Sequence, residues 1–310
     1  MEPTLEPMQP FVSVVIPVFN DADSLQLCLR ALEQQTYPRA NYEVIVVDNG
    51  SDRAEAVQAA VAECGQAIVA QEAQPGSYAA RNKGISLAKG AIIAFTDADC
   101  IPAPDWLERG VAHLQNHPDC GLLVGRINIF FQNPDRLTLV EQYEKVMAFQ
   151  QKEHLELYNY GSTANVFTFK QVIDRVGVFD ASLKSNGDFE WGRRIHAHGY
   201  KQLYADDVCI DHPARHSFAQ LYKRTVRLAG GIYDAQIQRC GTAVQRNKLF
   251  VRSVLEDLAT PLLSVADIFF DPKLDTFDQK INIYLINSFV RYVRAAEKIR
   301  LKLGGISTRG

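Results

Sequence analysis

Two aspartates stand one residue apart where an apolar segment of the chain ends. The stretch AFTDADCIPAPDW, residues 94–106, runs from apolar residues into Asp97 and Asp99 and then into a proline-rich turn. Carboxylates this close repel each other, and burial raises the cost unless a positive charge or a hydrogen-bond donor compensates. Alternation along a strand would point both side chains to one side, and Mg²⁺ or Mn²⁺ prefers carboxylate oxygens. The pair therefore predicts a divalent cation site, with a capped turn as the alternative.

Two further residues have the chemistry to bind a nucleotide diphosphate. Asp48 follows the apolar run VIVV and could accept hydrogen bonds from a base or a ribose, or it could instead cap the turn DNGSD. Arg81, in GSYAARNKG, lies just inside a predicted helix and could pair with a diphosphate, the alternative being an ordinary surface arginine. The chain has no GxGxxG after its first strand and no GxxxxGK[ST], which argues against a dinucleotide-binding dehydrogenase and a P-loop NTPase.

These residues need strands whose ends meet at one edge of a sheet. Apolar runs over 11–19, 42–48 and 91–99 are typical of buried strands, and helices of about a dozen residues separate them. This alternation predicts βαβ units, a parallel sheet, and a ligand outside the carboxyl ends of its strands. Further along, the pattern predicts a long helix over 137–157 and a last strand that ends at His212.

Composition limits the class of protein. With 310 residues, 47% of them apolar, the chain can build one large α/β domain with an appendage, or two domains. A net charge of -3 gives no basic field, so we expect no nucleic acid partner. The six scattered cysteines form no CxxC pair, which favours a reduced, cytoplasmic protein. Residues 1–10 are acidic and proline-rich, which predicts a flexible tail and not a signal peptide.

Six motifs occur in an order that resembles glycosyltransferase family 2. They are VSVVIPVFN, EVIVVDNGSD, ARNKGISLAKGAIIAFTDAD, GSTANVFTFKQVIDRVGVFD, GDFEWGRRI and the acidic strand that ends at His212, and they cover about residues 11–215. The resemblance implies an α/β protein of the GT-A fold, with a Rossmann-like, mostly parallel sheet flanked by helices and a helical C-terminal extension. The implied domains are a nucleotide-sugar-binding half over 11–100, an acceptor-binding half over 101–215 and the extension over 216–310.

The resemblance also implies which residues form the donor site. Asp99 matches the principal metal ligand, for Mn²⁺ or Mg²⁺, and His212 matches a position that completes the metal or diphosphate site. Arg81 falls near the diphosphate, and Asp97 on the ribose or the metal. The positions that match the nucleoside pocket are Pro17, Phe19, Asn20 and Asp48, with Asp48 on the base.

On the acceptor side, Asp188 matches the catalytic base of the family. Many members have Glu-Asp there, whereas this chain has Gly187 followed by Asp188. On local sequence alone, a helix N-cap is the favoured interpretation of Asp188, and only its position in the family pattern points to catalysis. The Gln-x-x-Arg-Trp element and membrane helices of processive synthases are missing, so transfer of one sugar per encounter is expected. The positions that match acceptor contacts are Gly161, Asn165, Glu190 and Trp191.

The reaction implied by the resemblance is hexosyltransferase-like, metal-dependent transfer from a nucleotide diphosphosugar, preferably a UDP-sugar, with inversion at the anomeric carbon. The acceptor is a hydroxyl of a polysaccharide, a lipid-linked saccharide or a small molecule. One alternative is a catalytically silent nucleotide-sugar sensor or scaffold. Another is a nucleotidyltransferase, which the chain supports poorly because no Gly-rich basic loop follows its first strand.

The C-terminal extension has an apolar stripe at helical spacing. Arginines and lysines are crowded at the end of the same segment. Such a helix either rests on an anionic membrane, packs on its own domain or joins a second subunit in a homodimer. We therefore expect a cytoplasmic protein, either free or peripheral on the inner face of the cell membrane. The stripe consists of Ile281, Leu285, Phe289, Tyr292, Ala296 and Ile299.

Overall fold

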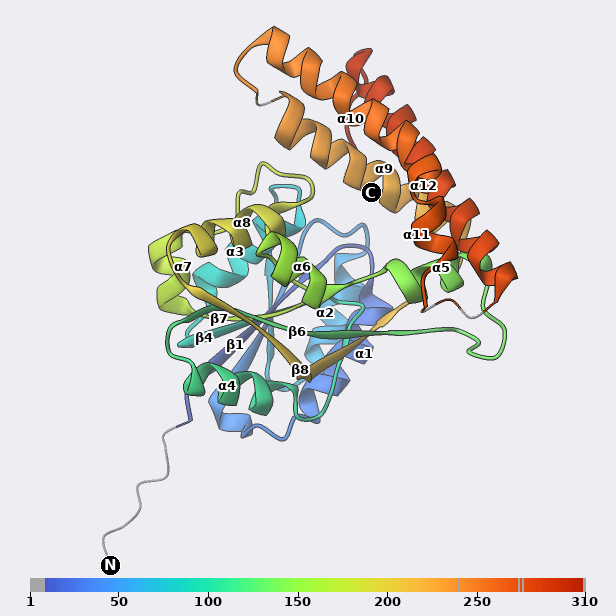
Figure 1. Cartoon of the computed structure of the whole chain (residues 1–310). Coiled ribbons are helices and arrows are strands. Elements are labelled where there is room, and N and C mark those ends of the chain that lie inside the picture. Colours follow the sequence, from blue (N-terminus) through green and yellow to red (C-terminus); the bar gives the residue numbers. More distant parts are fainter. Residues whose placement is uncertain (1–8, 239, 273, 275, 309–310) are drawn as a thin grey trace, which may run out of the picture. The chain divides into compact units, whose positions relative to one another are not determined.

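A computed structural model describes residues 9–238, 240–272, 274 and 276–308 (Figure 1). A flexible tail was predicted for residues 1–10, and residues 1–8 of it lie outside the described residues. The chain divides into two compact units. Unit 1 comprises residues 1–128, 149–182 and 187–212, and unit 2 comprises residues 129–148, 183–186 and 213–310. The second unit thus includes three segments of the half predicted over 101–215, namely 129–148, 183–186 and 213–215.

The first half of unit 1 alternates strands and helices, as predicted. Strand β1 pairs in parallel with both β2 and β4, and β2 pairs in parallel with β3. Helix α3 packs on β1 and β2, while α1 packs against α2. The elements are β1 (Val12–Val18), α1 (Ala22–Glu33), η1 (Arg39–Asn41), β2 (Tyr42–Asp48), α2 (Ala54–Ala62), β3 (Ala67–Gln71), α3 (Ser77–Leu87) and β4 (Ile92–Thr96).

The sheet continues with antiparallel pairs, so it is mixed. Its order is β3-β2-β1-β4-β7-β6-β8-β5, with β7 antiparallel to both β4 and β6, and β5 antiparallel to β8. The parallel part therefore carries the predicted donor residues, and the antiparallel part brings His212 back to the same sheet. The elements are β5 (Ile101–Pro102), α4 (Trp106–Asn116), β6 (Cys120–Phe130), β7 (Asn165–Phe169), α7 (Lys170–Val176), α8 (Gly187–Ala197) and β8 (Lys201–Pro213).

The prediction of one long helix over 137–157 is wrong. Helix α5 (Leu139–Met147) ends before α6 (Gln151–Tyr158) begins. Phe149, between them, has a φ of 47°, in the left-handed region, which a continuing right-handed helix does not contain. The hydrophobic pattern does not reveal this break, because both helices keep the same period.

Asn165 joins three strands of unit 1 inside the core. Its side chain is fully buried at the start of β7. The amide oxygen accepts a hydrogen bond from Trp106 Nε1 at 2.9 Å, and Nδ2 donates to the carbonyl oxygens of Arg126 in β6 at 2.8 Å and Val208 in β8 at 2.9 Å. These bonds satisfy both ends of the amide and hold β6 and β8 beside β7.

Unit 2 is helical, as predicted for the C-terminal extension. Helix α12 packs against α10, α9 and α5, and Figure 1 shows α10 and α12 running along each other. Asp257 of α10 is buried and contacts three cations of α12, with Lys298 Nζ at 2.5 Å, Arg294 at 3.2 Å and Arg291 at 3.3 Å. The elements are α5, α9 (Phe218–Ile232), the π-helical η2 (Tyr233–Gln238), α10 (Ala243–Leu263), α11 (Val265–Phe269) and α12 (Phe277–Lys302).

The buried face of α12 is not the predicted apolar stripe. The helix buries Ile283, Ile286 and Lys298, whereas Leu285, Tyr292 and Ile299 of the stripe are exposed. Packing of that stripe on its own domain, one of the three expectations, is therefore wrong for these residues. No helix among the described residues is both long enough and apolar enough to span a bilayer.

Asn165→Leu should lower the free energy of unfolding by about 2–5 kcal/mol, because it leaves one buried donor and two buried acceptors without partners. Asn128→Leu is the matched control, since Asn128 is an exposed β6 residue with one hydrogen bond, to Asp211 at 3.0 Å. Urea denaturation of both variants measures the difference. Equal midpoints would contradict the structural importance of Asn165.

Candidate functional site

The carboxyl ends of β1 and β2 form one side of the site. Val18, the last residue of β1, lies opposite Asp48, the last residue of β2. Asn20 follows with a left-handed φ of 55°, and its side chain exchanges hydrogen bonds with Asp52, donating to Oδ2 at 2.9 Å and accepting from the backbone N–H at 2.8 Å. Asn20 therefore fastens the loop after β1 to the loop after β2.

The other predicted nucleoside residues lie at the same edge. Asp48 is buried, and its Oδ1 accepts a hydrogen bond from the backbone N–H of Ser51 at 2.9 Å, which is the turn-capping interaction expected as an alternative. Pro17 is partly buried within β1, whereas Phe19 leaves about half of its surface exposed. The edge thus presents an apolar ring beside a carboxylate whose position is held by its own turn.

Asp97 and Asp99 do not share one partner. Strand β4 ends at Thr96, so both aspartates lie in a turn that the backbone N–H of Cys100 closes by donating to the carbonyl of Asp97 at 3.1 Å. Arg81 of α3 forms an ion pair with Asp97 and is only 4% exposed. The alternative of a surface arginine is therefore wrong.

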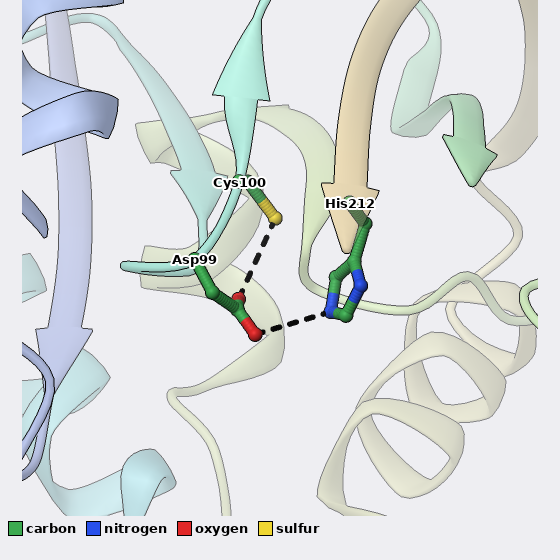
Figure 2. Close-up of side chains that lie close together, drawn as sticks. All are labelled: Asp99, Cys100 and His212. Carbon is green, nitrogen blue, oxygen red and sulfur yellow. Dashed lines mark hydrogen bonds and ion pairs between the residues drawn. The ribbon is translucent and has the colours of Figure 1, made fainter. Parts of the chain in front are cut away.

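Asp99 instead faces the end of β8 (Figure 2). Its Oδ2 lies 3.4 Å from Nε2 of His212, and the thiol of Cys100 lies 3.9 Å from Oδ1. The three side chains offer ligand atoms within 4.8 Å of one another. Burial, together with the negative charges of Asp97 and Asp99, raises the pKa of Cys100 well above its ordinary value, so the thiol stays protonated. The carboxylate of Asp99 and the imidazole of His212 therefore fit a cation without deprotonation of Cys100, and a bound cation would itself favour the thiolate as a third ligand.

Phe149 holds the imidazole in place. Its ring centroid lies 4.5 Å from that of His212, with a tilt of 49°. The left-handed backbone of Phe149 interrupts the helical segment, so the break that sequence periodicity missed places an aromatic ring against a residue of the site. His212 itself is almost completely buried.

Asp188 lies in the first turn of α8 and contacts Tyr78 of α3. Its Oδ1 accepts hydrogen bonds from the Tyr78 hydroxyl at 3.3 Å and from the backbone N–H of Phe189 at 3.0 Å. Burial raises the pKa of Asp188, and this effect outweighs the opposing contributions of the Phe189 N–H, of Arg81 and of the Tyr78 hydroxyl. The side chain is thus a carboxylate with increased affinity for a proton.

Gly187 is required by the same tyrosine. A Cβ at this position would lie 2.6 Å from Cε2 of Tyr78, which is closer than real Cβ contacts. The Tyr78 ring also stacks on Phe179 at 5.7 Å, and the Arg81 guanidinium lies over it at 5.8 Å. Tyr78 therefore fills the space where a glutamate side chain would begin.

Contacts connect Asp188 to the Asp99 cluster without interruption. They run from Asp188 to Tyr78, from Tyr78 to Arg81, and from Arg81 to Asp97, which shares its turn with Asp99. An aromatic cluster packs beside this row of contacts. The ring centroid of Phe179 lies 5.5 Å from that of Phe95 in β4 and 4.6 Å from that of Trp191 in α8. The elements that bear the site are thus fixed to one another by ring packing.

Most of the predicted acceptor residues are structural. Trp191 is buried, and its Nε1 donates to the carbonyl of Gly177 at 3.0 Å. Gly161 is packed against Val124, where a Cβ would lie 2.5 Å from Cγ2. Asn165 has its amide occupied as described above. Glu190 is partly exposed and forms a two-point ion pair with Arg194, at 2.9 and 2.8 Å.

Three residues that contact the site were not predicted from the sequence, namely Tyr78, Cys100 and Phe149. Tyr78 precedes Arg81 by three residues, so helical spacing alone puts both on one face of α3. Cys100 directly follows the aspartate pair. Phe149 carries no sequence signal, because its place depends on the helix break.

A small cavity of about 310 Å³ lies beside Asn20. Its lining includes Asp21, Asp23 and Asp52 but only one cation, Arg53. Such a negative lining disfavours a diphosphate. This cavity is therefore a poor place for the diphosphate of a ligand.

The sequence and the fold are similar to those of known proteins. Residues 13–185 match the family described as "Glycosyl transferase family 2". Glycosyltransferase AglE of Haloferax volcanii is 43% identical over 226 residues, which are 72% of this chain and 73% of AglE. Among solved structures, mannosyltransferase PcManGT from Pyrobaculum calidifontis, in complex with GDP-Man and Mn²⁺, has a TM-score of 0.64 at 21% identity over 94% of this chain and 87% of its own. GalNAc-T7 with UDP, GalNAc and Mn²⁺ has a TM-score of 0.54 at 18% identity, over 73% of this chain and 48% of its own.

Gly187→Ala should destabilise the protein by about 1–3 kcal/mol through overpacking against Tyr78. Helix propensity alone would predict the opposite sign, since alanine is favoured over glycine by about 1 kcal/mol. In a Tyr78→Ala background the new methyl group has room, so its cost should disappear. A double-mutant cycle from chemical denaturation measures the coupling, and an equal cost in both backgrounds would contradict the contact.

Asp188→Asn should raise the unfolding temperature at pH 7. The folded-state pKa of Asp188 is raised, so the folded protein binds this proton more tightly than the unfolded chain does, and the ionised form above that pKa costs stability. Asparagine removes this cost, and the advantage should vanish at low pH, where aspartate is protonated. Calorimetry across pH tests this, with Asp23→Asn in the exposed first turn of α1 as the control. A lower unfolding temperature at pH 7 would show that the carboxylate stabilises the fold.

Proposed function

The chain belongs to glycosyltransferase family 2 and is a glycosyltransferase, and we propose that it transfers one sugar from a nucleotide diphosphosugar to an acceptor hydroxyl with inversion at the anomeric carbon. The predicted GT-A fold, with its helical C-terminal region, is confirmed. The observation that carries the proposal is the unbroken row of contacts from Asp188 through Tyr78 and Arg81 to the turn of Asp97 and Asp99.

The donor occupies the carboxyl ends of β1, β2 and β4. Pro17, Phe19 and Asn20 line the nucleoside pocket, and Asp48 accepts hydrogen bonds from the base. UDP remains the preferred nucleotide on the family resemblance. The two solved structures contain GDP-Man in one case and UDP in the other, so the common fold serves either base.

Arg81 and Asp97 hold the diphosphate and ribose side of the donor. The guanidinium is buried, and Asp97 together with the Tyr78 ring fixes its direction. A guanidinium held in this way needs no reorganisation when the anion arrives. Asp97 itself either contacts the ribose or lies beside the metal.

Asp99 and His212 would hold a divalent cation, either Mn²⁺ or Mg²⁺. Both solved structures contain Mn²⁺ in their complexes, and a mixed oxygen and nitrogen donor set suits Mn²⁺ at least as well as Mg²⁺. When bound, the cation supplies positive charge to the leaving diphosphate. The Cys100 sulfur lies within 4.8 Å of both of these ligand atoms, but the assignment does not depend on it.

Asp188 takes the proton of the acceptor hydroxyl. The hydrogen bonds from the Tyr78 hydroxyl and the Phe189 N–H both go to Oδ1, which favours Oδ2 as the atom that receives the proton. The acceptor oxygen forms its bond to the anomeric carbon from the face opposite the diphosphate, while the bond to the diphosphate oxygen breaks and the nucleoside diphosphate leaves. The raised pKa of Asp188 favours this base over an ordinary aspartate.

The acceptor is a saccharide or a lipid-linked saccharide, and transfer is non-processive. Glu190, partly exposed and two residues after the base, contacts the acceptor, while Gly161, Asn165 and Trp191 position the strands and the helix around it. The alternative of a catalytically silent sensor depended on Gly187 as a sign of decay. Because Tyr78 accounts for that glycine and donates to Asp188, we do not retain this alternative.

Asp188→Asn and Asp99→Ala should separate chemistry from donor binding. Asp188→Asn should lower the transfer rate by about 10²–10⁴-fold while the affinity for a nucleotide sugar stays within about threefold, because a general base acts mainly in the transition state. Asp99→Ala should abolish the Mn²⁺-dependent part of that affinity. Isothermal titration with UDP- and GDP-sugars, with Mn²⁺ or EDTA, and single-turnover transfer measure the two effects. Equal losses of donor affinity in both variants would contradict the assigned functions.

A further inference from the structure

Helix α10 of unit 2 exposes a continuous apolar stripe. Five large side chains repeat at intervals of seven, four, three and four residues, which places them on one face of a helix. Their exposure is far above that of a packed helix face. The stripe consists of Val244 (78% exposed), Val251 (52%), Leu255 (58%), Leu258 (43%) and Leu262 (74%).

The stripe is not needed for the core of its own unit. The buried residues of α10 are Val254, Asp257 and Pro261, which lie on a different face, where Asp257 meets the cations of α12. An open depression of about 720 Å³ runs along the α10 surface and is lined by Val251, Leu255 and other α10 residues. A stripe of this size on a helix that is already anchored elsewhere indicates an external partner.

Charge identifies the kind of partner. Unit 2 has 19 Lys and Arg against 11 Asp and Glu, a net charge of +8, whereas unit 1 has 14 against 25, a net charge of -11. Lys248 and Arg252 line the depression together with Glu256, which pairs with Arg252 at 2.7 Å, and Lys302 Nζ reaches Asn247, another lining residue, at 2.5 Å. A second copy that met the stripe with its own would bring two positive units together. An anionic surface would be attracted to this unit and repelled by the other.

We propose that the α10 stripe rests on an anionic lipid bilayer, with its leucines and valines at the boundary between headgroups and acyl chains and its flanking cations among the headgroup phosphates. The proposed membrane-binding element is α10. In the 281–299 segment that the sequence suggested, Leu285, Tyr292 and Ile299 are exposed, but Phe289 packs against the core of unit 2. The proposal concerns the surface alone and does not depend on the transfer reaction.

Flotation of the whole protein with lipid vesicles tests the proposal. Wild type should float with vesicles of phosphatidylcholine and phosphatidylglycerol and far less with phosphatidylcholine alone, and raised salt should weaken its binding. Leu255→Asp with Leu262→Asp should reduce binding to the anionic vesicles by about tenfold or more. Each change removes an apolar side chain that the bilayer would bury and adds a negative charge that the anionic lipids repel. Both sites are exposed, so the variant should keep the unfolding temperature of the wild type.

A matched control carries the same substitutions on unit 1. Leu27 is 53% exposed and Leu157 is 67% exposed, so Leu27→Asp with Leu157→Asp makes the same change in charge and a similar loss of exposed apolar surface. This variant should bind the vesicles as the wild type does. A Leu262→Trp variant adds a local readout, since its emission should shift to shorter wavelength on vesicle binding while the native Trp106 and Trp191 stay buried.

Three results would overturn the proposal. The first is wild type that does not float with anionic vesicles, and the second is equal binding by the stripe and control variants. The third is a dimer in light scattering that the stripe variant dissociates, with no vesicle binding by the wild type, which would make the stripe a subunit interface. Because no assay here uses a sugar donor, failure of the transfer function would leave each result unchanged.

Discussion

The repulsion between Asp97 and Asp99 is the constraint around which unit 1 is arranged. The turn after β4 presents both carboxylates at the end of a buried strand, and separate segments provide a partner for each. Arg81 reaches Asp97 from α3, and His212 reaches Asp99 from β8, the far half of the sheet. Compensation of the two charges therefore fixes a helix and a distant strand to the same turn. The site is organised by this requirement before any ligand is considered.

The packing of Tyr78 explains why this chain has Gly187-Asp188 in place of the Glu-Asp pattern of its family. An aromatic ring at position 78 satisfies three neighbours at once, since it donates to Asp188, stacks on Phe179 and lies under Arg81. The ring then occupies the volume that a side chain at position 187 would need, so glycine follows from the choice of tyrosine. A second carboxylate beside Asp188 would raise the pKa of Asp188 by repulsion. In this chain, burial raises that pKa instead. The two arrangements thus reach a proton-binding carboxylate by different physical routes.

The sequence was sufficient to predict the ends of β1 and β2 to within one residue and to place Asp48 and Asp97 at one edge, because strand alternation and βαβ topology are local rules. The strand predicted over 91–99 instead ends at Thr96, and the place of Arg81 was implied by the family resemblance. The sequence was insufficient wherever the outcome depended on pairing between distant segments. Two examples are the ion pair between Arg81 and Asp97 and the hydrogen bonds that the buried Asn165 makes to β6 and β8. On α12, periodicity identified an apolar stripe but not the packed face, because the packed face includes Lys298 and Arg294, which Asp257 compensates. Hydrophobic patterns cannot anticipate a buried ion cluster.

The net charge of -3 conceals two opposite charge distributions, and this separation bears on how an anionic donor could bind. A nucleotide diphosphosugar that approaches unit 1 meets a net charge of -11. Asp97 already neutralises Arg81, so these side chains alone offer the diphosphate little uncompensated positive charge. A divalent cation between Asp99 and His212 would reverse the local sign at the point where the diphosphate must lie. The electrostatics of this chain thus support the proposal that donor binding depends on a metal.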